Sequence, residues 1–176
     1  NTAYDFYVRR ICIPGVDYSA NAKATATTLC AAVNVPYTQN FDGATPPAIP
    51  TCTSIQDLNG TPTWATVTAP AAWGFEGNSL RYLYSVTKPA NDWFFTQGLN
   101  LTAGTVYEVR FKYGATDPLY PERMKVAFGT SAVNTAMVNT IADFTNIIAI
   151  SGPPFANRVR YSFTPTTTGI NYIGFQ

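Results

Sequence analysis

The chain has 176 residues, of which 46% are hydrophobic and 14% aromatic, so it can bury a substantial core and is not expected to be disordered. Only 12% of the residues are charged and the net charge is +1, which gives no general attraction to nucleic acid or to an anionic membrane. The sequence contains no histidine, which excludes Ser-His-Asp and Cys-His catalysis, histidine metal ligands and a histidine pH switch. No apolar run approaches the roughly 20 residues of a membrane-spanning helix, so no membrane span is expected.

Alternating apolar and polar residues predict β-strands along most of the chain. Two strands are expected near the N-terminus, at residues 2–13 and 22–29. The later strand segments read SLRYLYSV, TVYEVRFKYG, ERMKVAFG and NRVRYSFTP. Segments rich in Gly, Pro and Asn separate them and predict turns. Many short strands with frequent turns indicate an all-β protein built as a β-sandwich.

One segment has helical spacing. In residues 131–144, Val133, Met137 and Ile141 recur every four positions. Thr and Asn are poor helix formers, so this segment is expected to form at most a short helix or an irregular crossing.

The chain is expected to divide near residues 30–36. The first part offers only two strands, which cannot bury a core alone. It is therefore either an N-terminal extension of the sandwich or the end of an upstream domain. We place the boundary so that residues 1–30 and 31–176 form separate units.

Two family resemblances follow from these segments. TAYDFYVRRIC, followed by a polar strand ending TTLC, resembles the last two strands of a fibronectin type III module. The ordered motifs VPYTQNFDG, IPTC, NDWFFTQGLNLTAGTVYEVRFKYG, YPERMKVAFGTS and YSFTPTTTGINYIGFQ are similar to the cleaved-adhesin, or choice-of-anchor J, family, which itself resembles MAM domains. This second resemblance covers roughly residues 35–176.

The resemblance implies a fold and a setting. The expected fold is a jelly-roll β-sandwich of the galactose-binding-like or MAM-like kind, preceded by two strands of a partial fibronectin type III-like sandwich. The family pattern continues beyond YIGF, so the jelly roll is expected to lack its last strand and the chain to be part of a longer protein. The implied setting is a secreted, cell-surface protein of Bacteroidota that uses type IX secretion.

The resemblance also implies a structural Ca²⁺ near the first strand of the sandwich. Calcium takes six to eight oxygen ligands, including carboxylates. Asp42, Asp57 and Asp92 are the candidate ligands. The alternatives are that Asp42 only forms a turn with Gly43, and that Asp92 caps a turn by accepting backbone hydrogen bonds.

Aromatic residues are the candidate ligand contacts. Trp73, Phe75 and Tyr120 are the proposed ligand-binding residues, and the first two lie in the loop APAAWGFEGN. The alternative is that Trp73 folds back and covers the end of the sandwich. Trp93 follows Asp92 and is either a sugar-stacking platform or a core residue.

The three cysteines, Cys12, Cys30 and Cys52, lack the spacing of a zinc site. A disulfide between Cys30 and Cys52, which flank the first strand of the sandwich, is the favoured pairing. Cys12 would then pair outside this segment or stay buried and free. The alternative is that all three are free thiols.

Basic residues recur on the outward face of three predicted strands. They are Arg110, Lys112, Arg123, Lys125, Arg158 and Arg160. If those strands are neighbours, the side chains form a stripe that could hold an acidic glycan or the carboxylates of a partner. The alternative is a solvated face that protects against aggregation.

No catalytic motif is present: the ten carboxylates are scattered, and there is no G-x-S-x-G, P-loop or dinucleotide fingerprint. Together with this absence, the resemblance to the cleaved-adhesin family implies a non-enzymatic adhesion module that contacts a glycan or a surface protein through end loops and adjoins neighbouring domains of the same chain. The alternatives are a structural spacer without its own ligand and an accessory domain of a carbohydrate-active enzyme.

Overall fold

The computed structural model describes residues 3–13, 17–27, 30–60, 62–149 and 157–176. The chain divides into two compact units, Asn1–Ala31 and Ala32–Gln176. Among the described residues, no helix is long and apolar enough to cross a membrane.

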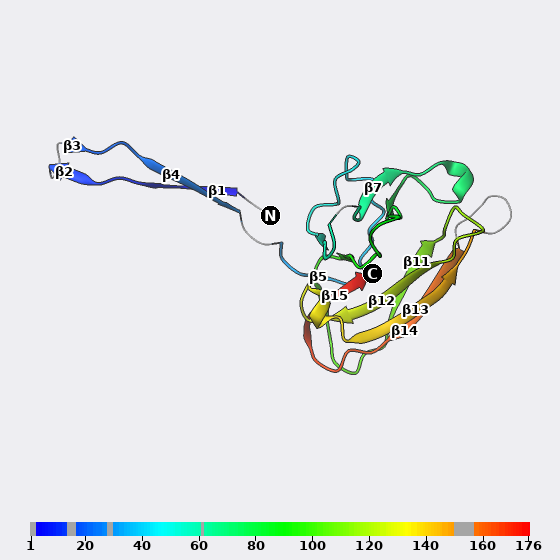
Figure 1. Cartoon of the computed structure of the whole chain (residues 1–176). Coiled ribbons are helices and arrows are strands. Elements are labelled where there is room, and N and C mark those ends of the chain that lie inside the picture. The colour runs from blue at the N-terminus through cyan, green and yellow to red at the C-terminus, as the bar shows by residue number, and fades with distance from the viewer. Residues whose placement is uncertain (1–2, 14–16, 28–29, 61, 150–156) are drawn as a thin grey trace. The chain divides into compact units, whose positions relative to one another are not determined.

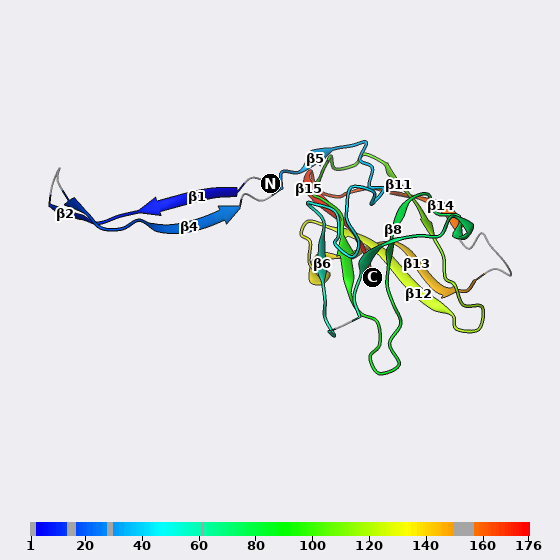
Figure 2. The same ribbon diagram turned by 90° about the horizontal axis from the view of Figure 1, so that it is seen from above.

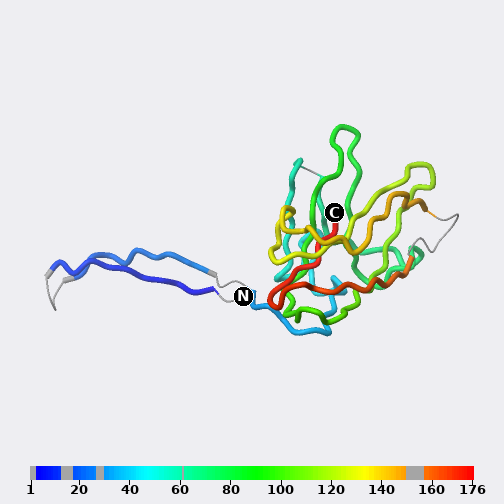
Figure 3. The backbone as a smooth tube through the Cα atoms, turned by 90° about the horizontal axis from the view of Figure 1, so that it is seen from below, coloured from blue at the N-terminus to red at the C-terminus, as the bar shows by residue number. Residues whose placement is uncertain are grey.

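The N-terminal unit is a β-hairpin whose two arms run side by side (Figure 3). Its paired strands are β1 (Ala3–Val8) with β4 (Ala22–Thr27), and β2 (Ile11–Ile13) with β3 (Asp17–Tyr18). Phe6 lies opposite Ala24, and the alternation places Tyr4, Phe6 and Val8 on one face, where all three are exposed. A two-stranded hairpin cannot bury such a face by itself.

The C-terminal unit is built on a seven-stranded sheet (Figure 1). Its main path runs in the order β13 (Asn139–Ile147), β12 (Glu122–Gly129), β15 (Gly169–Phe175), β10 (Leu99–Leu101) and β5 (Val33–Asn34). A branch adds β9 (Trp93–Phe95), which pairs with β15, and β6 (Ser54–Gln56), which pairs with β9. Among the strands that the structure describes, only the pairing of β5 with β10 is parallel.

Two smaller sheets complete this unit. β11 (Tyr107–Tyr113) pairs antiparallel with β14 (Asn157–Phe163) over seven residues. β7 (Ala65–Thr68) pairs with β8 (Asn78–Arg81), and the 3-10 helix η1 (Ala71–Trp73) lies between them in sequence.

The core lies between the large sheet and the β11–β14 pair. Buried Leu101, Val126 and Phe128 belong to one cluster, and Phe111 and Tyr161 of the β11–β14 pair pack against it. Other members of the cluster, or residues packed against it, include Leu99, Ala142, Ile173, Tyr107, Phe144, Phe163 and Phe175. The all-β sandwich expected from the sequence is therefore confirmed.

A second buried cluster lies on the other face of the large sheet. It joins Trp93 and Phe95 of β9 to Ala127 of β12 and Met137 of the following segment. The rings of Trp93 and Phe95 stack at 6.0 Å with an interplanar angle of 3°. Trp93 is thus a core residue, and the chain from residue 130 to 138 covers it.

This covering segment explains the helical spacing in residues 131–144. Only Asn134–Ala136 form a 3-10 helix, η2, and the strand β13 begins at Asn139. The short helix or irregular crossing expected there is confirmed up to residue 138. From there on the expectation is wrong, because pairing with β12 satisfies the backbone groups of β13 as a strand.

The predicted strand SLRYLYSV is also shorter than expected. β8 ends at Arg81, and residues 82–92 form a loop that extends away from the sheets in two views (Figures 2 and 3). Leu83, Tyr84 and Val86 are exposed there instead of packing in a sheet.

The cysteines follow the favoured pairing. Cys30 and Cys52 are disulfide-bonded. Cys12 is a free thiol among the described residues and is exposed, so the expectation that an unpaired Cys12 would be buried is wrong. Its hairpin has no core in which to bury it.

Candidate functional site

The end loops beside β11 hold the candidate ligand contacts. Lys112 donates hydrogen bonds from Nζ to the carbonyl oxygen of Gly74 at 3.0 Å and to Oε1 of Glu76 at 2.9 Å. These bonds fix the η1 loop against the C-terminal part of β11. Trp73 and Phe75 flank Gly74 and are half-buried, so each has a packed side and an accessible side.

The second loop at this end connects β11 to β12 and carries Tyr120. Its side chain is 69% exposed, and the neighbouring Leu119 is exposed as well. The backbone N–H of Leu119 donates to Oδ1 of Asp117 at 2.8 Å, and the carbonyl of Asp117 accepts from Ala149 N–H at 3.1 Å. The loop is therefore held at its base while its apolar tip faces solvent. Leu119 was not among the sequence candidates, although it adjoins Tyr120 between two prolines.

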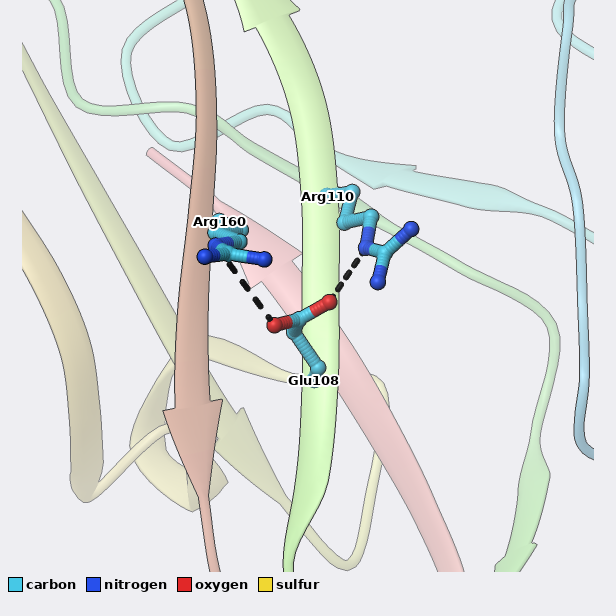
Figure 4. Close-up of polar contacts among 3 residues, drawn as sticks. All are labelled: Glu108, Arg110 and Arg160. Carbon is cyan, nitrogen blue, oxygen red and sulfur yellow. Dashed lines mark hydrogen bonds and ion pairs between the residues drawn. The ribbon is translucent and has the colours of Figure 1, made fainter.

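The outward face of the β11–β14 pair is basic. Arg110 lies directly opposite Arg160, and Lys112 lies directly opposite Arg158. Glu108 stands between the two strands and contacts Nε of Arg110 through Oε1 and Nε of Arg160, at 4.0 Å, through Oε2 (Figure 4). We call the four cations on these strands the basic face.

Two residues of the predicted basic stripe lie elsewhere. Arg123 and Lys125 belong to β12, which pairs with β13 and β15 in the large sheet. Lys125 lies opposite Asp143 there. The stripe therefore spans two of the three expected strands, because β12 and β11 belong to different layers.

Glu76, in the loop that follows η1, is the acidic neighbour of the basic face at this edge. The hydrogen bond and charge of Lys112 lower the pKa of Glu76, and the charge of Arg158 adds to this effect. Among the described residues Arg158 is in no ion pair, and Arg110 and Arg160 expose 73% and 74% of their side chains. Most of the positive charge on the basic face is thus available to solvent.

Asp92 lies against the segment that contains Asp57. Asp92 is buried, its Oδ1 accepts from Leu58 N–H at 2.8 Å, and its carbonyl oxygen accepts from Trp64 Nε1 at 3.1 Å. Burial raises the pKa of Tyr82, and the charges of Asp92 and Asp57 raise it further. Both carboxylates are therefore near enough to the Tyr82 phenol for their charges to influence its pKa.

The third predicted metal ligand, Asp42, anchors a different loop. Its Oδ1 accepts from Asn78 N–H at 2.7 Å, at the start of β8. An added Cβ on Gly77 would lie 2.2 Å from the same oxygen, so a side chain at this position would displace the carboxylate. Among the described residues, no three His, Cys, Asp or Glu side chains are grouped so as to hold a metal ion.

The geometry defines a class of protein: a β-sandwich whose accessible aromatic and basic side chains lie in end loops and on one strand face, while its scattered carboxylates serve mainly as hydrogen-bond anchors. No protein-family model and no curated protein matches the sequence. Among solved structures, the fold is similar to the K1 cleaved adhesin domain of Lys-gingipain from Porphyromonas gingivalis W83. The TM-score is 0.56 at 18% sequence identity, over 72% of this chain and 80% of that one. At this identity the likeness establishes a shared fold.

Proposed function

We propose that this chain is a non-catalytic adhesion module of a secreted, multi-domain cell-surface protein, and that it contacts a glycan or a protein through its end loops. The observation that carries the proposal is the exposed Tyr120 on a loop held at its base, at the end of β11 where the η1 loop presents Trp73 and Phe75. Exposed aromatic side chains on anchored loops supply contact area at a small entropic cost.

Two further findings support this setting. The shared fold with a cleaved adhesin domain favours a cleaved-adhesin or choice-of-anchor J type of module. The Cys30–Cys52 disulfide favours an oxidising compartment, as for a secreted or surface protein.

Binding to a broad glycan array and to a panel of surface proteins tests the proposal. Tyr120→Ala is expected to weaken binding by about tenfold or more, as for a buried aromatic contact. Tyr84→Ala is the matched control, because Tyr84 is 78% exposed in the 82–92 loop, which leaves β8 at the end away from η1. An array and panel without any ligand would contradict the proposal and favour a structural spacer.

We also propose that the N-terminal hairpin is the end of a fibronectin type III-like module of the same protein. Its apolar face, with Tyr4, Phe6 and Val8, is suited to pack against the other strands of such a sandwich. Extending the chain at its N-terminus should then protect the amides of β1 and β4 from hydrogen exchange. Unchanged exchange in the longer protein would refute this assignment.

A structural Ca²⁺ remains part of the proposal, and the residues present fit it in part. Oδ2 of Asp92 and Oδ1 of Asn59 are buried and have no hydrogen-bond partner among the described residues. Burying such an oxygen lowers the stability of the fold unless a cation or a hydrogen-bond donor contacts it. Asp92, Asp57 and Asn59 would hold the ion, with Oδ1 of Asp57 also accepting from the N–H groups of Asn59 and Gly60. Asp42 binds the start of β8 instead, through Asn78 N–H. The ion would supply charge neutralisation and rigidity.

Thermal melting with and without Ca²⁺ tests this site. At a free Ca²⁺ concentration one hundred times the Kd, binding adds about 2.7 kcal/mol to the free energy of unfolding. The stabilisation should disappear in Asp92→Asn and persist in Asp117→Asn, which changes a carboxylate remote from this group. A melting temperature indifferent to Ca²⁺ and to chelator would refute the site.

A further inference from the structure

We propose that the basic face of the β11–β14 pair binds a linear acidic polysaccharide whose sulfate or carboxylate groups pair with Arg110, Arg158 and Arg160. This surface goes beyond the end-loop contact, because it uses the outward faces of two strands and different side chains. The proposal also specifies the charge of the ligand, which is negative.

The first argument is the placement of like charges. Arg110 opposite Arg160 and Lys112 opposite Arg158 are two successive like-charged cross-strand pairs on the same face of one sheet. Like charges directly opposite one another destabilise a sheet. The inward residues of these strands make the core contacts, so folding does not require this arrangement.

The second argument is the charge balance. Four cations share this face with Glu108 and with Glu76 of the adjoining loop, which leaves a positive excess of two. The contacts of Glu108 with the two guanidinium groups are made through Nε, which leaves the terminal nitrogens to meet an anion (Figure 4). A guanidinium presents its donors in a planar fork that matches a carboxylate or sulfate.

The third argument is the shape of the surface. Arg110, Lys112, Arg158 and Arg160, with Phe111 and Val159, line an open depression of about 520 Å³. Residues two apart on a strand are separated by about 7 Å and neighbouring strands by about 5 Å, so the backbone sets the four cations at regular intervals on this face.

This array favours a polysaccharide over an acidic peptide. A linear acidic polysaccharide carries its anions at a regular spacing on a stiff chain, which suits cations placed at regular intervals on two paired strands. An extended peptide gains most where an open strand edge pairs with its backbone. Among the described residues each strand of the pair has one edge that pairs with no other strand, but the cations lie on the face of the pair, so a ligand that contacts them is held by its charges and not by backbone pairing.

Titration of the whole chain with size-defined heparin fragments, followed by calorimetry at two salt concentrations, tests the proposal. Arg158→Gln combined with Arg160→Gln is expected to weaken binding by about tenfold or more, as for lost charge-assisted hydrogen bonds. Arg81→Gln combined with Arg123→Gln removes the same charge at exposed positions outside the basic face and should change the affinity less than about twofold. Circular dichroism confirms the fold of each variant.

A variant that acts in the opposite direction strengthens the test. Glu108→Gln removes the carboxylate that contacts Arg110 and Arg160, so it should bind heparin more tightly. Glu122→Gln is its control, since it removes an exposed carboxylate of β12. Desulfated heparin, which keeps its carboxylates, distinguishes sulfate recognition from carboxylate recognition.

Three results would overturn the proposal. The first is an absence of heparin binding by the unmodified chain in either form of the polysaccharide. The second is an equal loss in both double variants, which would show that only net charge matters. The third is tighter binding of poly-glutamate or of a DNA duplex than of heparin through the same arginines, which would assign the face to another class of macromolecule.

Discussion

Replacing Trp93 by alanine tests the placement of the Asp92–Trp93 pair most directly. The indole is 4% exposed, stacks on Phe95 and is covered by the segment that contains Met137. If Trp93 were a platform for sugars, its removal would cost binding and little stability. If it is core, the cost appears in the free energy of unfolding.

The magnitude follows from the buried area. A buried aromatic side chain removes about 150–250 Å² from water. At about 25 cal/mol per Å² this corresponds to about 4–6 kcal/mol, and a compact unfolded state lowers the figure. Tryptophan-to-alanine changes in cores cost about 3–5 kcal/mol. For a unit of this size the melting temperature should fall by about 10–15 °C.

Urea unfolding followed by far-UV circular dichroism measures the effect. Trp73→Ala is the matched control, because Trp73 is half-buried in the η1 loop and should cost clearly less. A loss below about 1 kcal/mol for Trp93→Ala, or an equal loss for both variants, would refute the placement of Trp93 in a core under the 130–138 segment.

Three further predictions concern the loops and the disulfide. Gly77→Ala should cost at least about 2 kcal/mol, since its φ is +72° and the new Cβ would meet a carboxylate oxygen, whereas Gly104→Ala, at φ +74° with open space around it, should cost about 1 kcal/mol. Reducing the disulfide should lower the free energy of unfolding by about 3 kcal/mol through loop entropy, measured by denaturation with and without reductant. Lys112→Gln should raise the pKa of Glu76, because Lys112 lowers it, and NMR titration measures the change. The lowered pKa of Glu76 stabilises the folded state above the unfolded pKa, and this stabilisation is lost as pH falls through the folded pKa. The variant should therefore show a smaller pH-dependent stabilisation.

Periodicity predicted the layers of the sandwich but not how they are combined. The alternation in TVYEVRFKYG and NRVRYSFTP correctly separates inward aromatic residues from outward charges. The same alternation in ERMKVAFG could not show that β12 belongs to the other layer, because period two describes one strand and not its partners. The prediction of a three-strand stripe failed for this reason.

Local spacing also could not show where the chain crosses a sheet. Met137 fits a helical repeat, yet it is buried because the segment around η2 lies on Trp93 and Phe95. An added Cβ on Gly129 would lie 1.9 Å from the carbonyl oxygen of Ala136, so the backbone passes directly over β12. The only trace of this crossing in the sequence is Gly129, because a glycine within a strand can mark the close approach of another backbone.

The candidate site shows the same division between local and long-range information. Composition and turns identified Trp73, Phe75 and Tyr120 as loop aromatics, and the structure places the three in two loops at the same end of β11. The loop at residues 82–92 was not predicted, because the alternation of its apolar side chains resembles a strand. Loop residues and short strands share that pattern, and only pairing distinguishes them.

The two outer faces of the sandwich now have different roles. The chain itself covers the face of the large sheet that carries Trp93, so that face contributes stability. The face of the β11–β14 pair exposes Arg110 and Arg160, and their cross-strand pairing opposes stability. A surface that lowers the stability of the fold and stays exposed to solvent is better explained by ligand binding than by a role in folding. Recognition is therefore expected on this face and in the end loops that border it.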